Sequence, residues 1–411
     1  MRILIFEQRY TSVAEAGIGR FHAFARKWVE EGHKVTVVAG MVNYISGRDG
    51  VKSGFWGKEE QDGITVWRVF DRTFGYRSFG GRLWSYFSYW FIGCFLGLFL
   101  RRPDVVLASS PPISAGLLGY LVAFSRKARF VFEVRDLWPD EPVELGFLKN
   151  KILISWGHWL ERFLYCRAEQ IVGNSPGIKE YLVSEKGVPK SKVFVVPNAV
   201  EEKLFFGVKD FSLREKMGWS EKIIVLYLGS MSSVYDFSTI LDAAGKTQNK
   251  DILFVMVGDG RRRPEILKGK EEGNLENLLI LDAVPKSHVP EFIVAADICV
   301  ATLRNLSLLR YVYATKAIEY MAGGRPVVLA MEGVTKELVC DNAKGGICVS
   351  PENKKEFLDA VEKLAKNEKV RKKLGNSGKK YVEENFSLSL LAGEYLKILL
   401  KKTTRRTKAK V

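Results

Sequence analysis

The sequence predicts an α/β protein built from two tandem Rossmann-like domains. A chain of 411 residues is longer than one hydrophobic core usually supports, which favours two domains of about 200 residues each. In both halves short apolar strands alternate with helical stretches, as in a doubly wound parallel sheet. The alternation is interrupted once, at the turn Pro197-Asn198-Ala199, where a polar segment leads to a new series of strands.

The strands that we expect follow from short apolar runs bounded by Gly, Pro or polar residues. They are 3–6, 34–39, 105–108, 129–134, 170–173 and 193–196 in the first half, and 223–227, 252–257, 278–281, 298–301, 326–330 and 346–349 in the second. A final helical run, 354–401, should break near Phe386 and could lie back across the first domain. The predicted domains are therefore 1–198 and 199–385, followed by a C-terminal helix and basic tail, 386–411.

Positive charge is concentrated at the N-terminal half and the extreme C-terminus. The formal net charge is +16, and residues 1–200 hold 27 Lys and Arg against 19 Asp and Glu. Residues 401–411 hold six basic side chains and no acidic one. Such an excess suits an anionic membrane surface, a pyrophosphate-bearing acceptor or nucleic acid equally well. No helix-turn-helix, zinc or RNA-binding pattern occurs, so nucleic acid is not expected.

The five cysteines have no metal-binding spacing and lie mostly in apolar runs, which predicts reduced, buried thiols and no metal site. The chain opens with a strand rather than a signal peptide. Together these features favour a cytoplasmic protein.

Residues 83–100 form an uncharged apolar run flanked by Arg82, Arg101 and Arg102. Its 18 residues are at the lower limit for spanning a bilayer. A spanning helix would separate the next strand from the sheet, which disfavours it. A buried crossover helix remains an alternative. We favour a helix whose aromatic face enters the membrane interface, which would place the protein on the inner face of the cell membrane.

The loop after the first strand contains Gly17, Gly19 and Arg20 at the start of a helix. Glycines at a helix N-terminus allow a phosphate to approach the backbone. The spacing is not that of a dinucleotide fingerprint, and a simple entry loop is the alternative. A comparable turn, Gly258-Asp259-Gly260, follows the strand 252–257 and precedes Arg261. It suits a diphosphate, although a surface turn would have the same composition.

Two further clusters follow strands of the predicted sheets. Lys316 and Glu319 share one face of a short helix, where the carboxylate could accept ribose hydroxyls while the cation meets phosphate; a surface ion pair is the alternative. In the first domain Arg135 and Asp136 leave the strand 129–134, and they could line a crevice. Alternatively, an Asp of this run caps a helix with Arg135 as its partner.

In combination, these motifs resemble family-4 glycosyltransferases, in particular the bacterial branch for O-antigen, capsule and exopolysaccharide synthesis. The resemblance rests on segments in the same order along nearly the whole chain: G-I-G-R, E-V-R-D-L-W-P, V-P-N-A-V, V-G-D-G and T-K-A-I-E-Y-M-A-G-G-R-P-V-V. It implies the GT-B fold with a central cleft, and transfer with retention, without a cofactor or an obligatory metal.

The resemblance also implies roles for individual residues. Gly17 and Gly19, with Arg20, would approach the donor diphosphate, and Glu319 would hold the donor ribose. Gly258 and Gly260 match a nucleotide-side turn, and Val284 falls where the base is received. Arg135 and Asp136 are placed near the acceptor or the sugar.

The sequence departs from the family pattern at three points, one of which is Arg135, at the position of the family's histidine near the first-domain crevice. Tyr311 occupies the position of the first carboxylate of the E-x7-E motif. Ser230 and Tyr235 stand after Gly229, where the family carries the Arg and Lys that grip the diphosphate. Lys316, Arg304 and Arg261 are the candidates for the missing positive charge.

The expected reaction is therefore transfer of a hexose or N-acetylhexosamine-type sugar from a nucleotide diphosphate, with UDP preferred, to a polyprenyl-diphosphate-linked saccharide. In this scheme the departing phosphate can take the acceptor proton, and binding of the diphosphate relies on cations and helix N-termini. A UDP-sugar 2-epimerase of the same fold is the alternative enzyme class.

Overall fold

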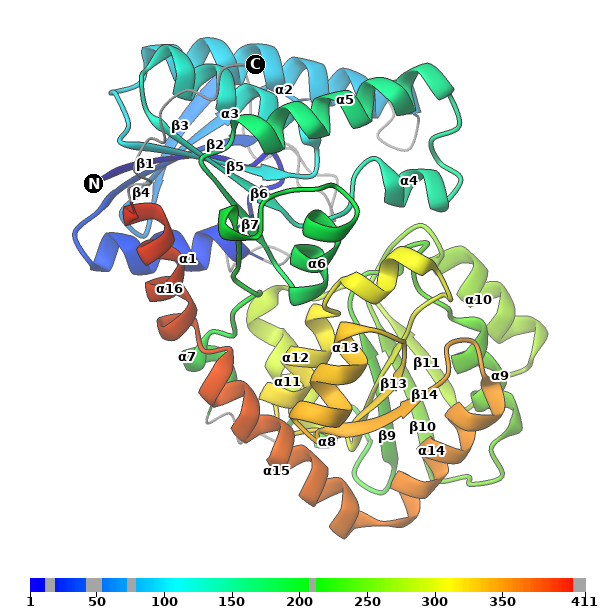
Figure 1. The fold of residues 1–411 in the computed structure, drawn as a ribbon. Coiled ribbons are helices and arrows are strands. Elements are labelled where there is room, and N and C mark those ends of the chain that lie inside the picture. The colour runs from blue at the N-terminus through cyan, green and yellow to red at the C-terminus, as the bar shows by residue number, and fades with distance from the viewer. Residues whose placement is uncertain (12–18, 42–53, 72–78, 207–211, 402–411) are drawn as a thin grey trace.

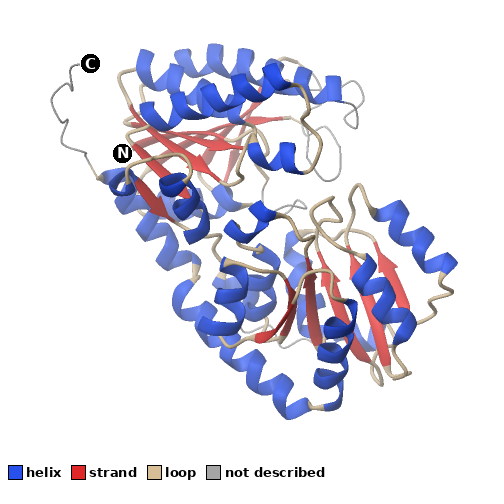
Figure 2. Cartoon of the chain, turned by 45° about the vertical axis from the view of Figure 1, so that its right-hand side comes forward, coloured by secondary structure: helices blue, strands red, loops and turns tan. Residues whose placement is uncertain are grey.

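The computed structural model describes residues 1–11, 19–41, 54–71, 79–206 and 212–401, and it divides them into two α/β domains (Figure 1). Gly17 and the basic tail beyond residue 401 lie outside the described residues. Each domain holds one sheet with helices on both faces, as the cartoon in Figure 2 shows. The prediction of two tandem Rossmann-like domains is confirmed.

The first sheet has eight strands in the order β3-β4-β2-β1-β5-β6-β7-β8. Every strand pair is parallel except β3–β4. The strands are β1 (Arg2–Phe6), β2 (Lys34–Gly40), β3 (Trp56–Gln61), β4 (Ile64–Val69), β5 (Val105–Ser110), β6 (Arg129–Val134), β7 (Gln170–Gly173) and β8 (Val193–Val195).

The hairpin of β3 and β4 at the sheet edge was not predicted. Asp62 and Gly63 form its two-residue turn, with φ of 49° and 77°. An Asp-Gly pair between two short strands is a strong hairpin signal, because both residues tolerate positive φ. The sequence therefore contained the information, but the polar composition of β3 concealed the strand.

Two helical layers cover the first sheet. On one face α2 (Phe79–Phe99) packs against α3 (Ile113–Ser125), and α3 packs against α5 (Lys151–Arg167), so that the three lie side by side (Figure 1). The other face carries α1 (Arg20–Glu30). Shorter elements complete the domain: α4 (Asp140–Glu144), α6 (Pro176–Ser184) and η1 (Lys190–Lys192).

The second sheet has six parallel strands in the order β11-β10-β9-β12-β13-β14. They are β9 (Ile223–Leu228), β10 (Ile252–Val257), β11 (Leu278–Leu281), β12 (Ile298–Thr302), β13 (Val327–Ala330) and β14 (Gly346–Val349). The accompanying helices are α7 (Glu202–Phe205), α8 (Ser212–Lys216), α9 (Ser238–Lys246), α10 (Arg263–Glu272), η2 (Lys286–His288), α11 (Val289–Ala295), η3 (Ser307–Tyr311), α12 (Thr315–Ala322), α13 (Val334–Lys336), η4 (Glu337–Asn342) and α14 (Lys354–Lys366).

The chain passes between the domains twice. After α15 (Glu368–Asn385), which packs on α12, the helical run breaks and α16 (Leu388–Leu400) packs on α1 of the first domain. The expected break near Phe386 and the return of the last helix to the first domain are confirmed. The two crossings are hydrogen-bonded to each other, since Val200 N–H donates to the Phe386 carbonyl and Leu388 N–H donates to the Val200 carbonyl.

Residues 83–99 of the apolar segment lie within α2, which packs against α3 and the sheet. Tyr89 is fully buried and its hydroxyl donates to the Val38 carbonyl, whereas Phe91 and Phe99 are largely exposed. The helix therefore buries one face and leaves an aromatic face open. No helix in the described part of the chain combines the length and apolarity needed to cross a membrane.

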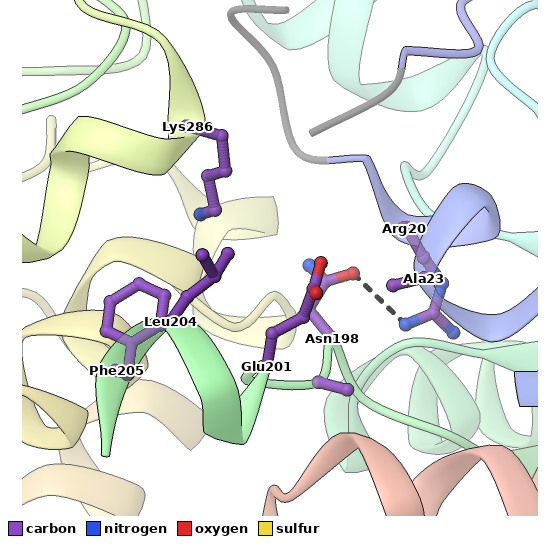
Figure 3. A pocket seen from close by; sticks show the side chains of 8 residues that line it. Arg20, Ala23, Asn198, Glu201, Leu204, Phe205 and Lys286 are labelled. Atoms are coloured by element: carbon purple, nitrogen blue, oxygen red, sulfur yellow. Dashed lines mark hydrogen bonds between the residues drawn. The ribbon is translucent and has the colours of Figure 1, made fainter. Parts of the chain in front are cut away.

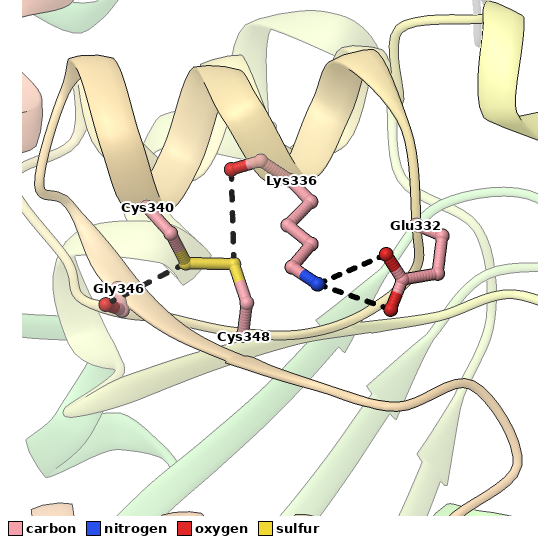
Figure 4. Close-up of a disulfide and its surroundings, with 5 residues drawn as sticks. All are labelled: Glu332, Lys336, Cys340, Gly346 and Cys348. Carbon is pink, nitrogen blue, oxygen red and sulfur yellow. Dashed lines mark hydrogen bonds and ion pairs between the residues drawn. A yellow bond between two sulfur atoms is a disulfide. The ribbon is translucent and has the colours of Figure 1, made fainter.

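The prediction of five reduced, buried thiols is wrong for three of the cysteines. Cys340 in η4 and Cys348 in β14 form a disulfide, drawn in Figure 4, and their Cα atoms are 6.3 Å apart. A helix and a neighbouring strand bring them together, which sequence spacing alone does not reveal. Cys166 is exposed; of the other two free cysteines, Cys94 is half-buried and Cys299 is buried.

Candidate active site between the two domains

The segment 307–315 of the second domain is docked on the first domain. The Glu144 carboxylate in α4 accepts hydrogen bonds from the Ser307 N–H (2.6 Å) and hydroxyl (2.6 Å) and from the Leu308 N–H (3.1 Å). The Ser175 hydroxyl donates to the Tyr311 carbonyl. Tyr311, at the position of the family's first carboxylate, thus forms part of the domain contact.

A group of ionisable side chains follows β1 and β6 in the first domain. The Arg135 guanidinium donates to the Glu7 carboxylate (2.8 Å) and to the Ser110 carbonyl (3.2 Å). Burial opposes its charge, but the carboxylates of Glu7, Glu133 and Asp136 raise the pKa of Arg135. The partner of Arg135 is therefore Glu7, and α4 has no side-chain cap, so the alternative of a capped helix paired with Arg135 is wrong.

Two carboxyl groups near this pair have raised pKa values. Burial raises the pKa of Asp136, against the effect of Arg135. Burial and the charges of Asp136 and Glu144 raise the pKa of Glu141 to about 8. Burial raises the pKa of Tyr235 in the second domain to about 12, and the charges of Glu319, Glu141 and Asp136 add to this effect. Sequence reasoning missed Glu141, although it adjoins the cluster in which Asp136 was singled out.

The Arg20 side chain is buried and hydrogen-bonded within the first domain. Its guanidinium donates to the buried Glu133 carboxylate (2.9 and 2.8 Å), to the Val196 and Pro197 carbonyls and to the Asn198 side chain. Both charged side chains are almost completely inaccessible to solvent. These contacts give Arg20 a structural role. Its donor-binding role stays a prediction, as does that of Gly19, the N-cap of α1 with φ of 60°.

The glycines after β9 and β10 bring two loops into backbone contact. A Cβ on Gly258 would lie 2.0 Å from the Gly229 carbonyl oxygen, and one on Gly260 would lie 2.5 Å from the Met231 carbonyl oxygen. Gly258 and Gly260 also have φ near 155°, a conformation that side chains disfavour. The Tyr227 hydroxyl donates a hydrogen bond to the carbonyl of Ser230, which is exposed. This bond holds the start of the loop after β9.

Lys316 ends beside these loops. It is only 7% exposed, and its Nζ lies 3.7 Å from the centroid of the Tyr227 ring and 3.8 Å from that of Tyr235. A Cβ on Gly229 would be 3.3 Å from this nitrogen. Among the described residues no hydrogen-bond acceptor contacts it. Burial lowers the pKa of Lys316 well below its usual value, and Glu319 only partly opposes this.

Glu319 of α12 forms an ion pair with Lys286 of η2, and both side chains are mostly buried. The alternative of a Lys316–Glu319 surface pair is therefore wrong. Val284, two residues before Lys286, follows β11 and is half-buried against the core. Sequence reasoning missed Lys286, which begins η2 shortly after the end of β11 and so carried a positional signal.

The arginines near the domain junction have different surroundings. Arg261 lies over the ring of Phe147 in the first domain, with its guanidinium carbon 5.3 Å from the ring centroid. Its neighbours Arg262 and Arg263 pair with Glu265 and Asp282.

Two pockets adjoin this region. One, of about 20 Å³, lies at the linker between the domains and is shown in Figure 3. Arg20, Asn198, Glu201, Phe205 and Lys286 are among its lining residues. A larger one, of about 350 Å³, lies beside the loops after β12, β13 and β14, and Arg304 and Arg310 contribute to its wall.

One group of side chains has the geometry of a metal site: Asp140, His158 and Glu161. The Lys186 ammonium, however, donates to Asp140 and Glu161 at 2.5 and 2.9 Å. It supplies the positive charge that these carboxylates need, so the cluster serves as an ion-pair network joining α4, α5 and the end of α6.

The chain matches two family models in tandem. Residues 17–199 match the glycosyl transferase 4-like domain, and residues 209–381 match the glycosyl transferases group 1. The chain belongs to family 4 of the glycosyltransferases. Both models describe transferases, which gives no support to the 2-epimerase alternative.

Relatives and solved structures agree with this assignment. The transferase is 24% identical over 367 residues to WcaI of Escherichia coli K12, named for colanic acid biosynthesis, covering 86% of this chain and 89% of the relative. It is 24% identical to the glycosyltransferase WbjE of Pseudomonas aeruginosa, covering 56% and 58%. HepE of Anabaena in complex with UDP-glucose is similar in fold, with a TM-score of 0.74 at 16% identity over 97% of this chain and 99% of HepE. The GT-B fold of the transferase is thereby confirmed.

Proposed function

We propose that this transferase moves a hexose or N-acetylhexosamine-type sugar from a nucleotide diphosphate, UDP in preference, to a polyprenyl-diphosphate-linked saccharide at a membrane surface, with retention. The observation that carries the donor half is the juxtaposition of Gly229, Lys316 and Glu319 where β9 ends and α12 begins. A buried amine beside close-packed glycine backbone suits a diphosphate, and a carboxylate one turn further along suits ribose hydroxyls.

The chemistry of this site needs no protein base. In transfer with retention the acceptor hydroxyl can attack from the side of the leaving group, and the departing phosphate accepts its proton. Positive charge that stabilises the leaving diphosphate is then the main electrostatic requirement. Glu319, Val284 and the turn 258–260 hold the nucleotide in this scheme, and Arg135 with Asp136 faces the acceptor or the sugar.

The acceptor half rests on an aromatic face formed by three neighbouring helices. α2 exposes a stripe at helical spacing, α3 exposes Phe124, and α5 exposes a second apolar group. The exposed side chains are Trp84, Phe87, Phe91, Phe95 and Phe99 on α2 and Ile152, Leu153, Trp156 and Trp159 on α5. Sequence reasoning anticipated α2 but not α5.

Basic residues border this aromatic face. Arg101 and Arg102 follow α2, Arg126 and Lys127 follow α3, and Lys151 opens α5. Aromatic side chains flanked by cations favour the interface of an anionic membrane. Docking there would bring a lipid-linked acceptor toward the first domain.

The donor half is tested by the thermal midpoint of the protein with UDP, GDP, ADP and CMP, because selective binding raises the midpoint by mass action. We expect a shift with one nucleoside diphosphate, UDP in preference, that is lost in Glu319→Ala. The matched control is Glu368→Ala, which removes an exposed carboxylate paired with Lys372 on α15 of the same domain. No shift with any nucleotide would contradict the proposal.

A further inference from the structure

The Lys316 side chain is buried without the partners that an ammonium requires. A charged lysine has three N–H donors to satisfy, yet no acceptor contacts Nζ in the described residues. The faces of Tyr227 and Tyr235 attract a cation, which offsets only part of the cost of removing it from water. As a neutral amine, in contrast, the nitrogen fits this aromatic enclosure.

The enclosure lies at a place where a ligand can supply what is missing. Lys316 lies beside Gly229 at the carboxyl end of β9, where an added Cβ would be 3.3 Å from Nζ, and ligands of open α/β sheets bind beyond these strand ends. Tyr235, the outer ring, is half-buried and belongs to the loop between β9 and α9. Displacement of this ring would expose the amine to a diphosphate without moving the sheet.

Resting on the proposed function, we propose that the donor diphosphate binds to Lys316 and that the amine takes up one proton from solvent as it binds. Nζ acquires the proton and becomes an ammonium, whose hydrogens are then donated to phosphate oxygens. The same proton is released when the nucleotide diphosphate leaves. Affinity for the donor should consequently fall as pH rises, because more of the binding free energy is spent on protonation.

Other titratable groups face this position and must be separated from it. Glu319 lies on the same helix, Tyr227 on β9 and Tyr235 on the following loop. Across the domain boundary, the charges of Glu141 and Asp136 contribute to the raised pKa of Tyr235. Burial already raises the pKa of Glu141 to about 8, so this carboxyl could also take up a proton near an added anion.

The test is isothermal titration calorimetry of the full chain with UDP at pH 8, in buffers of different ionisation enthalpy. A terminal phosphate, with its second pKa near 6, is already deprotonated there. We expect uptake of up to one proton per UDP by the wild-type chain and by Glu141→Gln. Lys316→Met should bind UDP at least tenfold more weakly and without proton uptake. Lys192→Met removes another half-buried lysine, which lies before β8 and donates to the Tyr165 and Cys166 carbonyls, and should match wild type.

Tyr235→Ala provides a second variant in case Lys316→Met does not fold. Removal of the outer ring hydrates the amine and lets it keep its proton, so UDP should still bind but with less uptake. UDP binding without proton uptake by wild type, or equal uptake by Lys316→Met, would overturn the inference and leave the proposed function intact. Absence of binding by UDP, GDP and ADP alike would overturn both.

Discussion

The carboxylate of Glu144 in the first domain caps the backbone of Ser307 in the second, with Oε1 2.6 Å from both the Ser307 nitrogen and its hydroxyl oxygen. This contact fixes the start of η3, whose last residue, Tyr311, lies on Ser175. The contact between the domains thus includes a side chain outside the segments that carry the family resemblance.

Removal of the Glu144 carboxylate should weaken the contact between the two domains. We expect Glu144→Ala to lower the free energy of unfolding by about 1–2 kcal/mol, since it removes hydrogen bonds to a charged acceptor. The radius of gyration from small-angle X-ray scattering should increase. Glu272→Ala, which removes an exposed carboxylate paired with Lys268, is the control and should change neither quantity. An unchanged radius in Glu144→Ala would show that other contacts hold the domains.

The buried Arg20–Glu133 pair should be far more sensitive to substitution than the partly exposed pair that Arg26, also on α1, forms with Glu201. Arg20→Met leaves a buried carboxylate without its cation, which typically costs about 3–5 kcal/mol. Arg26→Met breaks a pair with Glu201 that retains solvent contact, and should cost about 1 kcal/mol or less. Chemical denaturation of both variants measures the difference. Equal losses would contradict the structural role assigned to Arg20.

The loops after β9 and β10 approach each other so closely that position 258 should not tolerate a side chain. Gly258→Ala would place a Cβ 2.0 Å from the Gly229 carbonyl oxygen, so the backbone must move, and we expect a loss above about 2 kcal/mol. Gly187→Ala is the control: its φ is also positive, at 65°, but no atom lies within 4 Å of the added Cβ. It should cost about 1–2 kcal/mol from backbone strain alone. Nucleotide affinity should fall in Gly258→Ala only.

Glu141 should make stability depend on pH in a defined direction. Its pKa is raised in the folded chain to about 8, so folding favours the protonated form, and that stabilisation is lost as pH rises from about 4.5 to 8. Glu141→Gln keeps the shape without the charge. Its stability relative to wild type should therefore grow with pH through this window, by up to about 1.4 kcal/mol per unit. Thermal midpoints between pH 4.5 and 9 that run in parallel would contradict this assignment.

The aromatic face should bind anionic vesicles. We expect the Trp156→Ser/Trp159→Ser variant to sediment with phosphatidylglycerol vesicles at least tenfold more weakly than wild type, because it removes two exposed indoles. Leu390→Ser on α16, an exposed apolar residue on the opposite face of the sheet, should bind as wild type. Retention of the double variant on vesicles would show that α5 does not contact lipid.

The sequence predicted most strands correctly because nearly all of them are parallel and buried, so that apolar runs mark them. The hairpin strands β3 and β4 were not predicted. β3 is an edge strand that exposes polar side chains such as Lys58 and Glu60, and in β4 buried and half-buried residues alternate at its start instead of forming a continuous apolar run. At the site, position along the chain indicated Lys316 and Glu319 as candidate residues. It did not indicate that Glu319 forms an ion pair with Lys286. Pairing of this kind depends on side chains brought together by the fold, as does the disulfide, and no local pattern encodes it.

The return of α16 makes the first domain discontinuous in sequence. Trp28 of α1 donates its indole hydrogen to the Ala392 carbonyl, and Tyr395 reaches the carboxylate of Glu133. A fragment that ended at residue 198 would lack both contacts and would expose the apolar face that α16 covers. An independent first domain would therefore have to include residues 388–400. They could follow residue 198 through a designed linker, or precede residue 1 in a circularly permuted domain whose new termini lie at the domain junction.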